Sequence, residues 1–183
     1  MKLTVLEICL FGMLGALMFV SKLALEFLPN VHIVGVFIVA ITMVFRVKAL
    51  IPLYVFVFIT GFFYLFTTGG ILWWIPYLYI WTILWAMAML IPKKLPTRFK
   101  PIVYALVCGL HGFLYGTLYA PAQALLFGLN FEKMIAWIIA GLPWDAVHGV
   151  SNFILGFVVI TPMIIIMSMF QKNKNKKGQK ENL

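Results

Sequence analysis

Residues 143–170, PWDAVHGVSNFILGFVVITPMIIIMSMF, form the stretch that decides the fold class. This run is long enough to cross a bilayer as a helix, because a span needs about 20 predominantly apolar residues. Five further apolar runs lie upstream, at residues 4–28, 31–45, 49–66, 71–91 and 102–127. The sequence therefore predicts an all-α integral membrane protein, a compact bundle of six transmembrane helices.

The composition of the whole chain agrees with a membrane protein. Of the 183 residues, 64% are hydrophobic and 10% are charged, whereas about 25% of residues are charged in a soluble domain. Mean hydropathy is +1.06. Because such a chain could not cover a soluble surface with polar groups, the composition excludes a cytosolic enzyme and a secreted domain. The length predicts one transmembrane domain, residues 1–171, and the Lys/Asn-rich tail, residues 172–183, is predicted to be disordered.

A shorter apolar stretch, residues 132–141, precedes the last span. It is too short to cross the membrane, and Pro143 follows it at a position that suits the first turn of a new helix. The sequence therefore predicts a short interfacial helix at 132–141 that leads into the last span.

Positive charges predict the orientation of the chain in the membrane. With six spans both termini lie on the same side, and only Lys22 and Lys133 fall on the opposite side. The remaining lysines and arginines share the side of the termini: Lys2, Arg46, Lys48, Lys93, Lys94, Arg98, Lys100, Lys172, Lys174, Lys176, Lys177 and Lys180. Because Lys and Arg are enriched on the cytoplasmic side, we expect a multi-pass protein of the cell membrane with both termini in the cytoplasm. This orientation explains the net charge of +9, so we expect no nucleic-acid partner.

Polar and aromatic side chains gather in the half of the membrane away from the termini. They come from four separate stretches of the chain: Glu26, His32, Trp73, Tyr77, Tyr119, Gln123, Trp144, Asp145, His148 and Asn152. Asp145, His148 and Asn152 are spaced i, i+3, i+7, which places them on one helical face. Because polar groups inside a membrane are costly, the pattern predicts an outward-facing pocket with aromatic walls and a few convergent polar groups.

Most of these residues also have a structural explanation. Trp and Tyr are common at membrane interfaces, and Asp145 could interact with a helix dipole. The shared face of Asp145, His148 and Asn152 is the hardest to explain without a function. No P-loop, H-E-x-x-H or G-x-S-x-G motif occurs, and neither Cys9 nor Cys108 has metal-ligand spacing. We therefore expect no catalytic residues, no metal site and no cofactor.

Small residues in the first span form a second candidate surface. Gly12, Gly15 and Ala16 include a small-xxx-small pair, which lets helix backbones approach closely. The pair could serve internal packing or docking of a partner membrane protein.

Together these features resemble the substrate-binding S components of energy-coupling factor (ECF) vitamin transporters. The resemblance covers residues 4–170 and is carried by residues 12–16 (GMLGA), 26–32 (EFLPNVH) and 141–152 (GLPWDAVHGVSN). It implies that the chain binds a small ring-containing vitamin or vitamin precursor from outside and delivers it inward with a membrane coupling (T) subunit and two ABC-type ATPases. The family docks through an Ala-x-x-x-Ala motif in its first span, which here reads Gly12-x-x-x-Ala16.

Two other functions stay open at this point. A stand-alone secondary transporter or channel for a small solute would act without ATP or partner subunits. A membrane enzyme would use Asp145 and His148 as acid and base. The resemblance favours a transport subunit that is not itself an enzyme.

Overall fold

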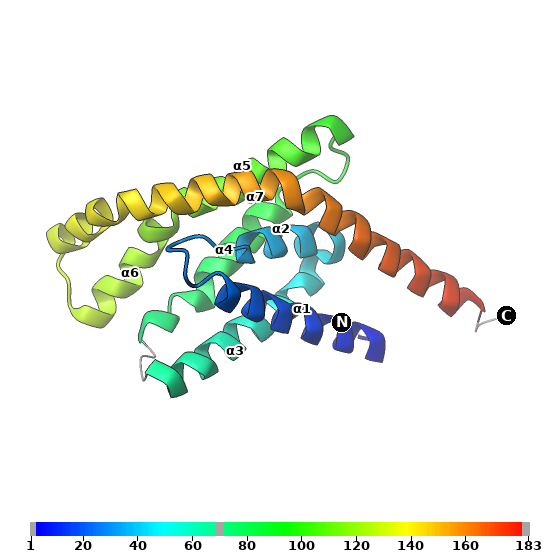
Figure 1. Ribbon diagram of the computed structural model, residues 1–183, viewed down its shortest axis with the longest axis horizontal. Helices are drawn as coiled ribbons and strands as arrows, with labels where there is room; N and C mark the ends of the chain where they lie inside the picture. Colours follow the sequence, from blue (N-terminus) through cyan, green and yellow to red (C-terminus); the bar gives the residue numbers. More distant parts are fainter. Residues whose placement is uncertain (1–2, 69–71, 181–183) are drawn as a thin grey trace.

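The computed structural model describes residues 3–68 and 72–180, with side chains described for residues 3–67 and 72–171. Across these residues the chain is helical and forms no strand, so the predicted all-α class is confirmed. The helices are α1 (Val5–Ala24), α2 (Val34–Phe45), α3 (Leu50–Thr68), α4 (Tyr77–Met89), α5 (Lys100–Phe113), α6 (Tyr115–Phe127) and α7 (Phe131–Lys180), with three short 3-10 turns, η1 (Arg46–Ala49), η2 (Leu72–Trp74) and η3 (Thr97–Phe99) (Figure 1).

Five segments of the described residues are long and apolar enough to cross a membrane. They are Val5–Ala24, Val34–Thr67, Leu72–Met89, Thr97–Phe127 and Phe131–Gln171. The second segment holds two of the six predicted spans, because only η1 separates α2 from α3. At 12 residues, α2 is about 18 Å long, which is shorter than the hydrocarbon core of about 30 Å. Several long apolar helices are compatible with a membrane protein, and the count of six crossings stays a prediction.

Hydrogen bonds to Trp85 and Met89 of α4 hold the turn between α2 and α3. Arg46 adopts a φ of +53°, a left-handed conformation that non-glycine residues rarely take. Its Nη2 donates to the Met89 carbonyl at 2.7 Å, and its own carbonyl accepts from Trp85 Nε1 at 3.1 Å. After this turn α3 runs back toward the opposite end of the bundle (Figure 1).

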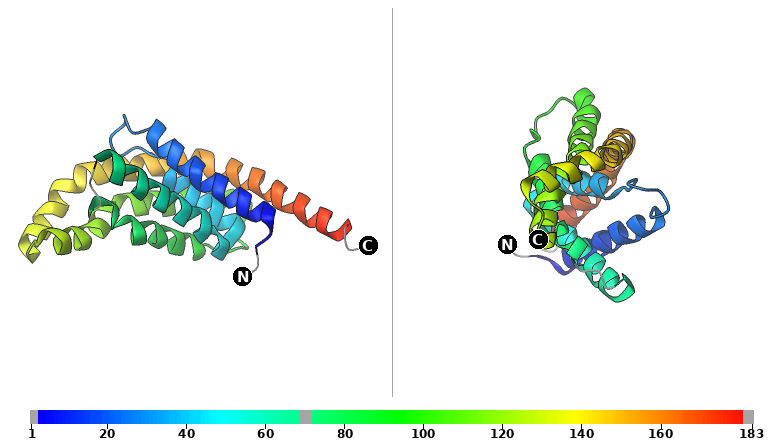
Figure 2. Two further views of the ribbon diagram at one scale, coloured as in Figure 1. Left: turned by 90° about the horizontal axis from the view of Figure 1, so that it is seen from below. Right: turned by 90° about the vertical axis from the view of Figure 1, so that its left-hand side faces the viewer.

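α7 differs from the prediction made for the end of the chain. It is one helix that passes through Pro143 and Pro162, so residues 132–141 are not a separate interfacial helix. A proline removes one backbone donor and bends a helix without necessarily ending it, and the start of α7 curves in Figure 2. The helical backbone also continues over residues 172–180, where the composition predicts disorder, and residues 181–183 lie outside the described part.

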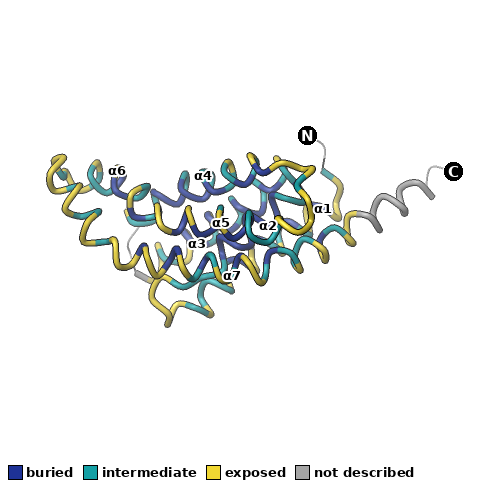
Figure 3. The backbone as a smooth tube through the Cα atoms, turned by 90° about the horizontal axis from the view of Figure 1, so that it is seen from above, coloured by how far each residue is buried: buried dark blue, intermediate teal, exposed yellow. Residues whose placement is uncertain are grey.

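The core of the bundle is built around α2. Every residue from Val34 to Thr42 is buried, and α2 packs against α4 and α7, while α1 packs on α3 and α5 on α7. Figure 3 shows burial concentrated among these central helices and exposure rising toward the α6–α7 connection. The exterior carries large apolar side chains such as Phe62 and Leu125, which suits a surface facing lipid.

The two ends of the bundle carry different connections. α1 begins and α7 ends at the same end, together with the basic turns η1 and η3 (Figures 1 and 2). The α1–α2 and α6–α7 connections lie toward the other end (Figure 1). The predicted side of the membrane for each end stays a prediction.

Candidate functional site

Two adjoining pockets lie at the end of the bundle away from the start of α1. The carboxylate pocket, of about 390 Å³, is lined by Asn30, Trp73, Tyr115, Gly116, Tyr119, Gln123, Phe127, Trp137, Gly141, Trp144 and Asp145. The loop pocket, of about 290 Å³, is lined by Lys22, Leu25, Glu26, Leu28, Pro29, Asn30, Val31, His32, Trp73, Tyr77, Tyr115 and Tyr119. Four residues line both pockets: Asn30, Trp73, Tyr115 and Tyr119.

A connected set of aromatic rings forms the wall between and beneath the pockets. Tyr77 and Trp81 are four residues apart on one face of α4, and their ring centroids are 5.6 Å apart. The ring centroids of Trp81 and Tyr115 are 5.8 Å apart, and those of Tyr115 and Tyr119 are 6.1 Å apart. The Tyr119 hydroxyl donates to the Trp73 carbonyl at 2.6 Å, which ties α6 to η2. The rings therefore form a preorganised surface rather than independent membrane-interface residues.

The polar face of α7 points into the bundle. Asp145, His148 and Asn152 are 6%, 1% and 0% exposed. Asp145 Oδ1 accepts a hydrogen bond from the Gly116 backbone N–H at 2.9 Å. The His148 ring lies 4.4 Å from the His32 ring and 4.8 Å from the Tyr115 ring, measured between centroids. The structure thus brings the α7 face against the α1–α2 connection and α6.

Several buried polar atoms in this region have no hydrogen-bond partner among the described residues. They are His32 Nδ1, Trp81 Nε1, Asp145 Oδ2, His148 Nε2 and both amide atoms of Asn152. Buried polar atoms are nearly always paired in native proteins, and one left unpaired costs about 1–3 kcal/mol. Two of these residues, His32 and Asp145, line the pockets, where they can offer hydrogen bonds to a bound molecule.

Lys22 and Glu26, which line the loop pocket, both contact Tyr64 of α3. Lys22 Nζ donates to the Tyr64 hydroxyl at 2.8 Å and lies 4.0 Å from Glu26 Oε1. The Tyr64 hydroxyl in turn donates to the Glu26 carboxylate. Burial, followed by the electrostatic effects of Lys22 and His111, lowers the pKa of His32 to about 4. His32 is therefore neutral at pH 7, and Lys22 and Glu26 balance one another.

The structure places most of the predicted site residues together. Glu26, His32 and Tyr77 line the loop pocket, Gln123, Trp144 and Asp145 line the carboxylate pocket, and Trp73 and Tyr119 line both. His148 packs on His32 behind the pockets. Asn152 lies deeper and is not among the residues that line either pocket. It lies close to Gly35 of α2, where an added Cβ would come within 3.5 Å of its Nδ2.

Several site residues were not predicted from the sequence. Trp81 follows Tyr77 by one helical turn and Tyr115 precedes Tyr119 by one turn, so helical spacing could have found both. Asn30 joins the site through the α1–α2 connection, and Trp137 joins it through the first turns of α7. Gly116 contributes a backbone N–H that donates to Asp145. Every residue type except proline has such a group, so the sequence could not predict this contact.

The small residues of α1 separate into two groups. Gly15 is buried against α3, where an added Cβ would lie 2.5 Å from Val55 Cγ1, so Gly15 belongs to internal packing and not to an outer surface. Gly12 has no other described atom within 4 Å of such a Cβ, and Ala16 is exposed. Of the three residues predicted to dock a partner, Gly12 and Ala16 remain on the outside.

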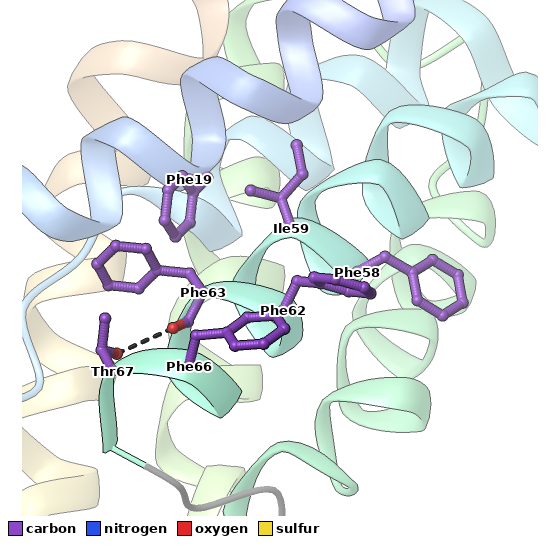
Figure 4. A pocket seen from close by; sticks show the side chains of 7 residues that line it. All are labelled: Phe19, Phe58, Ile59, Phe62, Phe63, Phe66 and Thr67. Atoms are coloured by element: carbon purple, nitrogen blue, oxygen red, sulfur yellow. Dashed lines mark hydrogen bonds between the residues drawn. The ribbon is translucent and has the colours of Figure 1, made fainter.

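A third hollow, between α1 and α3, has a different chemistry. It measures about 580 Å³ and is lined by Phe19, Phe58, Ile59, Phe62, Phe63, Phe66 and Thr67 (Figure 4). The Thr67 hydroxyl is occupied, because it donates to the Phe63 carbonyl at 2.9 Å. This groove offers no polar recognition, so it suits lipid contact better than a water-soluble ligand. Among the described residues, no cluster of three His, Cys, Asp or Glu side chains could hold a metal ion.

Comparisons of the chain with family models, with curated proteins and with solved structures find no match.

Proposed function

We propose that the chain is the substrate-specific S component of an ECF-type importer. It binds a small ring-containing vitamin or vitamin precursor and delivers it inward with a coupling subunit and two ATPases. The observation that carries the proposal is the convergence of aromatic rings with His32 and Asp145, whose Nδ1 and Oδ2 atoms have no partner among the described residues, in two adjoining pockets at one end of an apolar bundle. Pockets of about 300–1,000 Å³ with this mixture are typical of small-molecule sites.

The distribution of polar groups favours a receptor over a channel. Toward the end where α1 begins, the core includes the apolar Phe11, Phe45 and Leu53, and the buried Glu7 is paired with Lys48. The buried hydroxyls of Thr42 and Thr60 donate to carbonyls of their own helices, at 2.6 and 2.7 Å. A polar solute crossing the bundle would meet few free polar groups there. A stand-alone secondary transporter or channel for a small solute remains the alternative.

The remaining parts of the proposal concern topology and partners. We infer six crossings, formed by α1, α2, α3, α4, α5 with α6, and α7, with both termini in the cytoplasm. The chain carries no P-loop, so ATP hydrolysis belongs to partner subunits and the chain is not itself an enzyme. The outer surface at Gly12 and Ala16 is where a coupling subunit would dock, because small side chains allow close helix approach.

Ligand binding is the first test of this proposal. The purified chain is incubated with a panel of radiolabelled vitamins and precursors, and bound label is counted at equilibrium. We expect one compound to bind with a Kd below micromolar. A panel in which no micronutrient binds below micromolar concentration would contradict the proposal.

A second test separates binding from transport. In cells with a complete coupling module, Gly12→Trp with Ala16→Trp should abolish uptake and leave ligand binding intact, because the bulky rings block docking. Leu106→Trp, on an exposed face of α5, is the matched control and should preserve uptake. Uptake by the chain alone in liposomes without ATP would favour the stand-alone transporter.

A further inference from the structure

We propose that the carboxylate pocket selects a ring-bearing organic cation, with Asp145 as its counter-charge and Gly116 as the residue that positions Asp145. This inference rests on the proposed function and names the chemical class of its substrate.

The charges around the two pockets differ. Of the described residues that line the carboxylate pocket, Asp145 is the one acidic side chain, and no Lys or Arg lines that pocket. In the loop pocket Lys22 and Glu26 lie 4.0 Å apart and offset each other. The described residues form two ion pairs, Lys22–Glu26 and Lys48–Glu7, and Asp145 takes part in neither. An ionised Asp145 would therefore give the carboxylate pocket a negative charge that no cation among the described residues pairs with.

The surroundings of Asp145 make this imbalance costly. The side chain is 6% exposed and receives one hydrogen bond, from the Gly116 N–H, while its Oδ2 atom has no partner among the described residues. A buried carboxylate without a cation is strongly disfavoured. A cationic ligand in the adjoining pocket would offset that cost, whereas an anion would increase it.

The aromatic walls select the same class of ligand. The rings of Tyr119 and Trp137 are nearly parallel, with 19° between planes and centroids 5.8 Å apart. Both rings line the pocket, and Tyr115 and Trp73 line it as well. Aromatic faces stack on flat rings and attract cations. Ring faces and one unbalanced carboxylate together favour a flat, positively charged heterocycle.

Gly116 is essential to the position of the carboxylate. A Cβ added at Gly116 would overlap Asp145 Oδ2 and would lie 3.0 Å from Oδ1 and Cγ. Only glycine lets the α6 backbone come this close while donating its N–H. Gly116→Ala should therefore displace the carboxylate without removing its charge from the chain.

The experiment compares three probes of one shape and different charge. They are the 1-methylnicotinamide cation, neutral 3-methylbenzamide and the 3-carbamoylbenzoate anion, titrated against the full chain in lipid nanodiscs by calorimetry. We expect the cation to bind about 10- to 100-fold more tightly than the neutral probe, and the anion to bind most weakly. This comparison needs no variant, so it does not depend on whether a substitution folds.

Variants then test the assigned residues through the ratio of cation to neutral affinity. Asp145→Asn should bring that ratio close to one, and Gly116→Ala should lower it. Thr117→Ala, at the next residue and exposed, is the control and should keep the wild-type ratio. A purely structural role for Asp145 would lower both affinities together and leave their ratio unchanged.

The inference is overturned if the neutral or anionic probe binds as tightly as the cation, if the cation fails to bind at millimolar concentration, or if Asp145→Asn keeps the wild-type ratio. The proposed function survives those results when a neutral or anionic vitamin binds below micromolar concentration. It fails separately when uptake needs no partner subunits, whatever the charge of the ligand.

Discussion

Two buried carboxylates lie at opposite ends of the bundle in different surroundings. Glu7, 7% exposed near the start of α1, lies 2.6 Å from Lys48 Nζ and accepts from the Thr4 backbone N–H at 3.0 Å. Asp145, 6% exposed, accepts one backbone hydrogen bond and has no cationic partner among the described residues. The two carboxylates are therefore almost equally buried, but Glu7 has a cationic partner and Asp145 has none among the described residues. A buried carboxylate that is paired with a cation stabilises the fold. A buried carboxylate that lies beside a pocket without a cationic partner is a candidate for ligand contact.

The largest effect is expected from removing Lys48, which forms an ion pair with Glu7. Lys48→Met removes the cation but keeps most of the side-chain packing, so it should lower the free energy of unfolding by about 3 kcal/mol. Chemical denaturation in detergent measures the change. Lys94→Met, exposed in the loop after α4, is the control and should change stability little. Equal stability of the two variants would show that the Glu7–Lys48 pair is not structural.

Replacing Asp145 is expected to change the free energy of unfolding in the opposite direction. Asp145→Asn removes an unbalanced buried charge and keeps an oxygen for the Gly116 N–H, so stability should stay constant or rise by about 1 kcal/mol. Glu7→Gln, which loses the ion pair to Lys48, should lower stability in the same assay. If both substitutions destabilise the protein equally, the distinction between the two carboxylates is wrong.

The smallest expected effect is the pH dependence of stability that is due to His32, a residue that lines the loop pocket. Its pKa of about 4 in the folded chain lies below the ordinary value of 6.5, mainly because burial disfavours the charged ring. The unfolded chain therefore takes up the proton more readily, so stability is complete above pH 6.5 and declines as pH falls toward 4. The titratable and charged groups around His32 are Lys22, Glu26, Tyr77, His111, Tyr115 and His148.

Between pH 7 and pH 6 the loss of stability due to His32 should stay below about 1 kcal/mol. Thermal unfolding followed at both pH values measures it, and His32→Gln should reduce the decline. An unchanged decline in His32→Gln would assign the pH dependence to other groups.

Much of the candidate site was predictable because helical periodicity survives in a membrane. The i, i+3, i+7 spacing of Asp145, His148 and Asn152 predicts one face, and that face is buried as a unit. The continuity of α7 was not predictable in the same way, since Pro143 suits both a helix start and a bent helix interior. Gly12 and Gly15 are also alike in sequence, and only the position of Val55 separates their roles.

The sequence by itself determined that the chain is helical and apolar, and that its polar groups gather toward one end, because both properties follow from residue type and local periodicity. The tertiary structure alone decided that Gly116 donates to Asp145, that His32 lies on His148, and that Tyr119 and Trp137 stack. These contacts join residues far apart in the chain. They depend on how whole helices pack and on where loops close, and local periodicity carries no information about either.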